Sequence, residues 1–423
     1  MPWTRSFAGL KRRGAAWYDS VMEMPRLKVS ERMRSMMTYR KLAGNRPRIL
    51  VLESQYWLDG ACMNAARAMG WEVERAPVVM AGQMPREHVA GVLHKLADFR
   101  PDFVLSVNIS GMDFDGMFAR LFEDLRVPFV TWFVDDPRTI LMGRTCYATP
   151  YTVVLTWDKA YEPYLRGVGF EVVCSVPLGV DTTLFDAEPP DEWDLPPTFV
   201  GNSMTQFARE EWAWVEQYPD LARGIRESFE GGRVNRVTFG QGLEALLGKD
   251  ATKQLDMDQA RHAEMVFFIE GTRRLRHALV ERMAPEGVYV RGDEWWRELT
   301  PAAGGPLGYV NELADYYRRC PVSLNTTSIQ MPNTVNQRVF DCPAAGGFLL
   351  TDAQPDLAEL FDVTEEAACY TSLDECSEMF GYYRDHPAVR KEMAAKARKR
   401  VLGEHTYQHR LRQIAALVKE RFG

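Results

Sequence analysis

The 423-residue sequence lacks the marks of several protein classes. Its seven cysteines are scattered and form no C-x-x-C pair, which favours reduced thiols in the cytoplasm over a disulfide framework. No stretch reaches the ~18 uninterrupted apolar residues of a membrane span, and the N-terminus has no apolar signal-peptide core. Repeats and low-complexity tracts are absent as well. We therefore predict a globular protein of the cytoplasm.

An overall excess of positive charge is also lacking, because the net charge is −7. This balance gives no reason to expect nucleic acid as a partner. The first 46 residues are nevertheless locally basic, with Trp3, Phe7, Leu10 and Trp17 interleaved among the charges. We interpret residues 1–46 as a helical extension that packs on the domain or on a second subunit. Peripheral contact with an anionic membrane or an acidic partner is the alternative.

A chain of this length is expected to form two domains. Between Arg48 and Gly179, short apolar runs alternate with helix-like segments, which is the pattern of a parallel, doubly wound α/β sheet. The predicted strands cover residues 48–54, 71–79, 102–110, 127–136, 151–157 and 171–179.

The second half of the sequence repeats this organisation after a stretch rich in proline and acidic residues, which is typical of an interdomain linker. Its predicted strands cover 198–204, 287–293, 322–328 and 348–352, and one closing helix covers 386–422. Two Rossmann-like domains of this kind are expected to face each other across a cleft. The predicted parts are an extension (1–46), an N-terminal domain (47–180), a linker (181–197), a C-terminal domain (198–400) with a helical insertion at about 205–283, and a final helix (401–423) near the domain junction.

Residues after the strands carry most weight for function, because ligands of open parallel sheets bind beyond the carboxyl ends of the strands. A dinucleotide site would need G-x-G-x-x-G after the first strand. This motif is absent, which disfavours a nicotinamide-dependent dehydrogenase. Gly60 alone can let backbone amides at a helix start approach a phosphate, and simple turn geometry is the alternative.

Two adjacent carboxylates, Asp135 and Asp136, end the fourth predicted strand and precede Pro137. Repulsion between neighbouring carboxylates favours proton uptake by one of them, so Asp135 is our first candidate for a general base. A helix N-cap followed by proline is the alternative interpretation. Asp59, after the first strand, is the second candidate base, and Asn108, at the end of the third strand, is a weaker site candidate.

The stretch 333–352 contains the residues of a nucleotide-sugar site. Arg338 can neutralise a diphosphate, and Asp341 can accept hydrogen bonds from both ribose hydroxyls. Their spacing of three places them on one helix face, where an intrahelical ion pair is the alternative. Gly346 and Gly347 let the backbone approach phosphate oxygens. The polar residues that precede this pair are Asn333 and Asn336.

A metal site is not predicted. His405 and His409 are spaced for one helix face, but no third ligand is evident. The sequence has no D-x-D flanked by strand residues, and the acidic residues at 113–115 fall where a helix cap is expected. We predict metal-independent chemistry without a cofactor, in which Arg338, backbone amides and a helix N-terminus stabilise a leaving diphosphate.

Several of these segments resemble one family. The stretch "VPLGVDTTLF" (176–185) resembles the segment that joins the domains of many GT-B glycosyltransferases. The stretches "FVDDP" (133–137) and "NQRVFDCPAAGGFLLTD" (336–352) resemble the CgeB-like, or spore-maturation-protein-like, glycosyltransferases. The resemblance implies an α/β protein of the GT-B type, with a nucleotide-sugar donor site in the C-terminal domain, an acceptor site in the N-terminal domain and no obligatory metal. In this family a Glu usually holds the donor ribose, and the shorter Asp341 takes that position here. The residues expected to border the same pocket are Gly201, Asn202, Asn325 and Thr326.

The sequence thus predicts transfer of a sugar from a nucleoside-diphosphate sugar to an acceptor. The acceptor is a protein such as flagellin or a surface glycan, and the sequence leaves inversion or retention of the anomeric centre open. Asp135 acts as the base if the reaction inverts. The alternatives are an epimerase or phosphorylase on the same fold and a non-catalytic nucleotide-sugar-binding protein.

Overall fold

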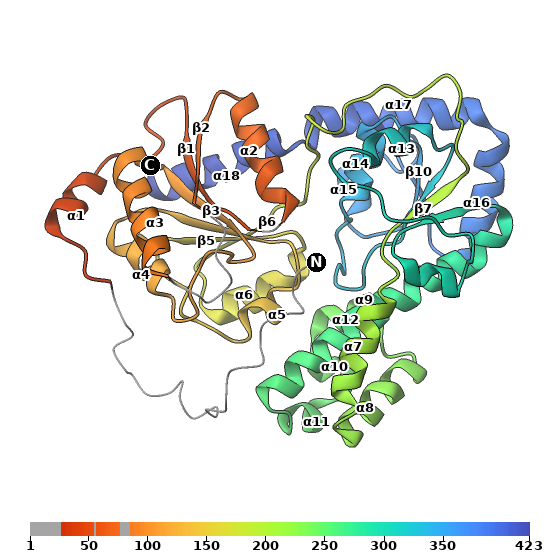
Figure 1. Cartoon of the computed structure of the whole chain (residues 1–423), viewed down its shortest axis with the longest axis horizontal. Coiled ribbons are helices and arrows are strands. Elements are labelled where there is room, and N and C mark those ends of the chain that lie inside the picture. The colour runs from red at the N-terminus through yellow and green to blue at the C-terminus, as the bar shows by residue number, and fades with distance from the viewer. Residues whose placement is uncertain (1–26, 55, 77–84) are drawn as a thin grey trace. The chain divides into compact units, whose positions relative to one another are not determined.

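The computed structural model describes residues 27–54, 56–76 and 85–423, which form two compact units (Figure 1). Unit 1 contains the described residues up to Thr156, together with Glu162–Cys174 and Leu411–Gly423. Unit 2 contains Trp157–Tyr161 and Ser175–Arg410. Most of the predicted basic extension, and the last residues of the second predicted strand, lie outside the described residues.

Unit 1 is built on a six-stranded sheet with the order β2-β1-β3-β4-β5-β6. The pairs β1–β2, β1–β3, β3–β4 and β4–β5 are parallel. The strands β3 to β5 are buried throughout because their runs are almost entirely apolar or β-branched, as expected for a sheet covered on both faces. All six predicted strands are present. Their bounds are β1 Arg48–Leu52, β2 Glu72–Ala76, β3 Phe103–Val107, β4 Phe129–Phe133, β5 Thr152–Thr156 and β6 Val172–Ser175.

The helices of unit 1 supply the apolar cover for this sheet. In α4, for example, Phe118 stacks on Phe122, whose ring lies 5.5 Å from that of Phe129 in β4. The last helix of the chain returns to this unit, where Phe422 stacks on Tyr151. The helices are α1 Glu31–Met37, α2 Trp57–Ala68, α3 Arg86–Phe99, α4 Met117–Asp124, α5 Pro137–Leu141, α6 Glu162–Val168 and most of α18 Tyr407–Phe422.

Unit 2 contains a five-stranded sheet with the order β11-β10-β9-β7-β8, and its assigned pairs are parallel. The predicted strands are present, but sequence analysis missed β11, which has only three residues. The bounds are β7 Thr198–Val200, β8 Tyr289–Arg291, β9 Ser323–Leu324, β10 Leu349–Asp352 and β11 Ala368–Tyr370. The helices that accompany this sheet are α13 Leu313–Arg319, α14 Arg338–Ala344, α15 Leu357–Leu360, α16 Leu373–Asp385 and α17 Pro387–Glu404.

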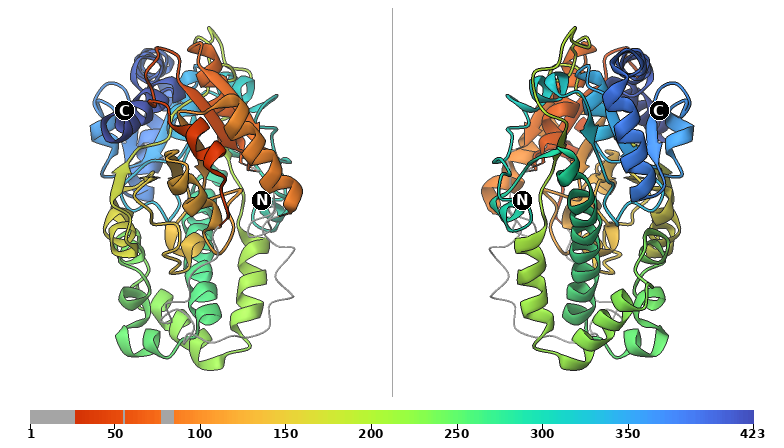
Figure 2. Two further views of the ribbon diagram at one scale, coloured as in Figure 1. Left: turned by 90° about the vertical axis from the view of Figure 1, so that its left-hand side faces the viewer. Right: turned by 90° about the vertical axis from the view of Figure 1, so that its right-hand side faces the viewer.

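The predicted insertion between β7 and β8 is a bundle of helices that projects from the sheet of unit 2 (Figure 2). It has its own apolar core, which includes Ile225 and Phe267, separate from the sheet core around Phe199 and Trp296. Its longest helix begins with a capping box formed by Asp256 and Gln259. The helices are α7 Thr205–Val215, α8 Pro219–Glu230, α9 Arg236–Gln241, α10 Leu243–Leu247, α11 Lys249–Lys253 and α12 Met257–Met283.

The predicted closing helix is in fact two helices, α17 and α18. The break occurs because the backbone of Val180 pairs with the chain at this point: its amide donates to the carbonyl of His405 at 2.9 Å, and its carbonyl accepts from Tyr407 at 3.0 Å. The predicted linker also packs on unit 2, where the amide of Ala187 donates to the carbonyl of Ala344. In the described residues no helix is both long and apolar enough to cross a bilayer.

Candidate functional site

The carboxyl ends of β7 and β9 in unit 2 bring together most of the predicted donor residues. Gly201 and Asn202 follow β7, and Asn325 and Thr326 follow β9. Arg338, at the start of α14, reaches between them. Its Nη1 donates to Asn325 Oδ1 at 2.6 Å, and its Nη2 lies 3.2 Å from where a Cβ on Gly201 would stand. A glycine at position 201 thus leaves room for this guanidinium beside the backbone.

Two side-chain amides hold this arrangement in place. Asn325 is fully buried and donates to Thr351 Oγ1 at 2.8 Å. Asn336 Nδ2 lies 2.9 Å from Asn325 Oδ1 and also approaches the carbonyl of Thr326. The side-chain amides of Asn325 and Asn336 form hydrogen bonds with each other. They therefore hold Arg338 in position and do not serve as donors to a ligand.

Sequence analysis missed a second arginine at this site. Arg276, from α12, donates to the carbonyl of Asn202 at 2.7 Å. Burial and the neighbouring positive charge of Arg338 lower the pKa of Arg276 to about 9, while Asp293 opposes the shift. Its buried Nε has no hydrogen-bond partner within the described chain. Two cations therefore stand close together, and a diphosphate has the charge and the acceptor oxygens to satisfy both.

The loop from β7 to α7 lies beside the two arginines. Ser203 is held by Asp293, which accepts from both its amide and, at 2.7 Å, its hydroxyl. Trp296 Nε1 donates to the carbonyl of Gly201 at 2.7 Å. The loop turns through Met204, which has a φ of +64°, directly into α7. The positive end of this helix dipole therefore lies beside the loop and favours a bound anion.

Asp341 is enclosed in a hydrogen-bond network. Tyr309 Oη donates to its Oδ2 at 3.0 Å and Gln337 Nε2 to its Oδ1 at 2.6 Å. Gln337 also donates to the carbonyl of Gly179 and accepts from Tyr407. Burial raises the pKa of Asp341 to about 8, although these hydrogen bonds oppose the shift. A ribose hydroxyl would have to use a remaining lone pair or displace one of the present donors.

The pair of glycines after α14 is surrounded by protein. Gly346 has a φ of +80°, and a Cβ there would stand 2.6 Å from the backbone of Glu188. A Cβ on Gly347 would stand 2.8 Å from both Cys342 Sγ and the carbonyl of Tyr317. Packing of the linker and of α13 therefore accounts for both glycines, in place of the predicted approach to phosphate.

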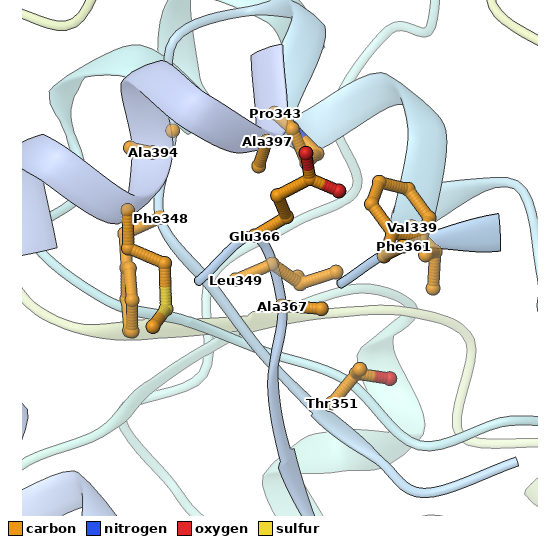
Figure 3. Close-up of a pocket in the computed structure, with 12 residues that line it drawn as sticks. Val339, Pro343, Phe348, Leu349, Thr351, Phe361, Glu366, Ala367, Ala394 and Ala397 are labelled. Atoms are coloured by element: carbon orange, nitrogen blue, oxygen red, sulfur yellow. The ribbon is translucent and has the colours of Figure 1, made fainter. Parts of the chain in front are cut away.

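Gly347 also lines a small, mainly apolar pocket beside β10, α14 and α17 (Figure 3). None of the other predicted donor residues lines this pocket. Its walls are made by Val339, Pro343, Gly347, Phe348, Leu349, Thr351, Phe361, Glu366, Ala367, Met393, Ala394 and Ala397.

In unit 1, Asp135 lies with two polar side chains at the carboxyl ends of the strands. Tyr56 Oη and Asn108 Nδ2 donate to its Oδ2 at 2.8 and 2.9 Å. Asn108 and Ile109 both adopt left-handed backbone conformations, with φ of +51° and +53°. This conformation is strained for a β-branched residue, and such strain clusters at functional sites.

Asp136 has a different role from its neighbour. It is almost fully buried, accepts from the amide of Arg138 at 2.9 Å and forms an ion pair with the same arginine at 2.6 Å. The side chain thus caps α5, with Pro137 at the first helical position. This is the N-cap interpretation that the sequence left open.

Asp59, the second candidate base, lies in α2 and is 3% exposed. Its Oδ2 accepts from the amide of Ser54, whereas its Oδ1 has no partner among the described residues. Burial raises the pKa of Asp59 to about 6. Gly60 follows it inside the same helix, and no atom lies within 4 Å of where its Cβ would stand.

The two histidines considered as metal ligands have other partners. His405 Nε2 donates to the carbonyl of Leu360 at 2.9 Å, and His405 Nδ1 accepts from Arg410 Nη2 at 3.0 Å. His409 Nδ1 lies 2.7 Å from Thr406 Oγ1 at the start of α18. Across residues 27–54, 56–76 and 85–423, no three His, Cys, Asp or Glu side chains are grouped to hold a metal ion.

Comparison with solved structures identifies the class of fold. A glycosyltransferase from Rickettsia africae ESF-5 superposes with a TM-score of 0.53 at 9% identity, covering 89% of this chain and 99% of the other. Sucrose-phosphate synthase from Thermosynechococcus elongatus gives 0.51 at 12% identity, with the same coverage. Anabaena HepE in complex with UDP and glucose gives 0.49 at 12% identity, covering 88% and 99%. The chain has the GT-B fold, with two parallel-sheet α/β domains.

A family comparison agrees with this class. Residues 267–416 match the family described as "Glycosyl transferase-like". A comparison with curated protein sequences finds no match. The matched segment contains Arg276, Arg338 and Asp341, so the family and the fold together support a glycosyltransferase.

Proposed function

We propose that the protein transfers a sugar from a nucleoside-diphosphate sugar to an acceptor bound by unit 1. The observation that carries this proposal is the pair Arg276 and Arg338 beside the loop that leads into α7. The charge of Arg338 lowers the pKa of Arg276, and Asp293 only partly opposes this shift. The carbonyl of Asn202 accepts one hydrogen bond from Arg276, and the amide oxygen of Asn325 accepts one from Arg338. A diphosphate supplies the missing negative charge.

The roles of the other residues follow from this donor position. Arg276, Arg338 and the start of α7 stabilise the leaving diphosphate, which makes the reaction independent of a metal ion. Asp341 accepts hydrogen bonds from the ribose, as the CgeB-like resemblance implies. In unit 1, Asp135 is oriented by Tyr56 and Asn108 and removes the acceptor proton if the reaction inverts.

The acceptor is a protein such as flagellin or a surface glycan, modified in the cytoplasm. An epimerase or phosphorylase would use the same donor site without transferring a sugar to an acceptor. A binding protein would keep the donor site and lack turnover. Detection of glycosylated acceptor in the reaction mixture separates these possibilities.

The donor site is tested by thermal shift and calorimetric titration with UDP, GDP, ADP and dTDP. We expect at least one of them to stabilise the parent protein, and Arg338→Ala and Arg276→Ala to weaken its binding by about tenfold or more, since each removes a charged hydrogen-bond donor. Arg223→Ala is the control, because this arginine is 66% exposed on the insertion. Equal affinity in the parent and both site variants would overturn the proposed donor site.

A further inference from the structure

Residues 325–336, in the connection from β9 to α14, form a buried loop. Only Asn333 and Asn336 in it are half-buried, and every other residue is buried. Loops usually stay at the surface because their backbone polar groups need partners. In this loop, partners come from several separate segments of unit 2.

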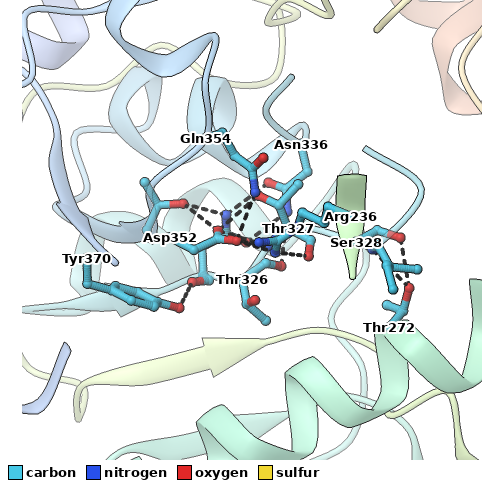
Figure 4. A network of polar contacts seen from close by, with 12 residues as sticks. Arg236, Thr272, Thr326, Thr327, Ser328, Asn336, Asp352, Gln354 and Tyr370 are labelled. Carbon is cyan, nitrogen blue, oxygen red and sulfur yellow. Dashed lines mark hydrogen bonds and ion pairs between the residues drawn. The ribbon is translucent and has the colours of Figure 1, made fainter. Parts of the chain in front are cut away.

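The beginning of the loop is held from β10 and from the insertion (Figure 4). Asp352 accepts from the amide and the hydroxyl of Thr327, at 2.9 Å each. Arg236 of α9 contacts the same carboxylate and donates to the carbonyl of Thr327 at 2.7 Å. The close packing of Gly271 in α12 against Ile329 fixes the next residues.

The end of the loop is held by Asp158. Its carboxylate accepts from the amides of Asn333 and Thr334, at 2.7 and 2.9 Å, and from Asn333 Nδ2 at 2.8 Å. The neighbouring Tyr161 donates to the carbonyl of Gln330 at 2.6 Å. Asp158 is fully buried.

The position of Asp158 in the sequence is unexpected for this role. It belongs to Trp157–Tyr161, which lies between β5 and α6 of unit 1 in the sequence but is part of unit 2 in the fold. It also lies outside the segment that matches the glycosyl transferase-like family. Within the short turn that it begins, its carboxylate accepts a hydrogen bond from the amide of Ala160 at 2.8 Å. Three further hydrogen bonds connect it to the loop.

We infer that Asp158 is a positioning residue for the nucleotide-sugar site. By fixing residues 333 and 334, Asp158 sets the position of Asn336. The side chain of Asn336 donates to Asn325, and Asn325 accepts a hydrogen bond from Arg338. The arginine that faces the diphosphate is therefore aligned by a carboxylate supplied from the N-terminal half of the sequence. This inference rests on the proposed function.

The test is Asp158→Asn, which keeps the shape of the side chain but replaces one acceptor oxygen by a donor that faces N–H groups. We expect the dissociation constant of the best-binding nucleoside diphosphate among UDP, GDP, ADP and dTDP to rise about tenfold, or about 1.4 kcal/mol. In turnover, the KM for the donor should rise while the KM for the acceptor stays unchanged.

Asp113→Asn is the matched control. Asp113 is also buried and accepts from three amides, those of Asp115, Met117 and Phe118, but it lies in unit 1. Both variants should lose thermal stability, and only Asp158→Asn should lose nucleotide affinity. Tyr161→Phe, which removes a single hydroxyl from the same segment, should weaken binding in the same direction by a smaller factor.

Three results would overturn the inference in different ways. If the parent protein bound none of the four diphosphates, the proposed function would fail and the inference with it. If the parent protein bound one of them, and Asp158→Asn and Tyr161→Phe bound it equally well, only the positioning role would be wrong. Equal weakening by Asp113→Asn would also overturn it, because the effect would then follow from lost stability alone.

Discussion

At the scale of single residues, the protonation of Asp341 affects stability. Its raised pKa of about 8 means that the folded protein holds a proton that the unfolded chain, with a carboxyl pKa of 3.8, releases. The stability contributed by this group is thus fully present below pH 4 and is lost progressively as the pH rises through 8.

We therefore expect Asp341→Asn, which resembles the protonated acid, to gain stability relative to the parent protein between pH 5 and pH 8. Melting temperatures of both proteins at the two pH values check this. A difference that stays constant with pH would show that the carboxyl group is already ionised in the folded protein at pH 5.

The adjacent residues Asp135 and Asp136 have different partners, so their substitutions should have different effects. If the reaction inverts, Asp135→Asn should lower kcat by roughly 10²-fold or more, the usual contribution of a general base, and leave nucleotide binding unchanged. Asp136→Ala should instead reduce the free energy of unfolding by about 1 kcal/mol, because it removes a helix cap. Steady-state kinetics and urea denaturation distinguish the two. Full activity in Asp135→Asn would exclude it as the base.

The candidate site could be predicted from sequence only in part. Asn325 lies at the end of a predicted strand, and Arg338 lies in the stretch 333–352 that resembles a known family. The sequence therefore sufficed to predict that both belong to the site. Arg276 was not, because the run "RRLRH" in a long helix has the pattern of a solvated face. Asp158 was missed because its partners lie about 175 residues away in the sequence, and no local pattern encodes such a contact.

At the scale of elements, two glycines are predicted to respond in opposite directions. Gly346→Ala should destabilise the protein by more than about 1 kcal/mol, because φ is positive and the linker backbone fills the adjacent space. Gly60→Ala should stabilise it by about 0.5–1 kcal/mol, because Gly60 lies within α2 and has open space beside it. Urea denaturation of both variants measures the difference. Loss of activity without loss of stability in Gly60→Ala would instead support the phosphate-binding interpretation of that residue.

The elements themselves were largely predictable. Strands such as β3 to β5 are continuous apolar runs between turn residues, and this pattern is typical of strands in buried parallel sheets. β11 was missed because three residues following an acidic stretch are too few to show a periodicity. The break between α17 and α18 could not be predicted either, since it depends on backbone pairing with Val180, far away in the sequence.

At the scale of the whole molecule, the proposed chemistry predicts independence from divalent cations. The arginines and the start of α7 would stabilise the leaving diphosphate, so dialysis against EDTA should leave the rate of sugar transfer unchanged within about twofold. Restoration of a lost rate by added Mg²⁺ or Mn²⁺ would contradict this mechanism.

The interleaving of the two units has a consequence for how the protein is made. Leu411–Gly423 belongs to unit 1 but is synthesised after every residue of unit 2. During synthesis on the ribosome, the sheet of unit 1 therefore cannot pack against α18 until all of unit 2 has been synthesised. A fragment that ends in the linker would expose the apolar surface that α18 normally covers, including the ring of Tyr151 that Phe422 stacks on. Such a fragment should need chaperone help that the full-length chain does not.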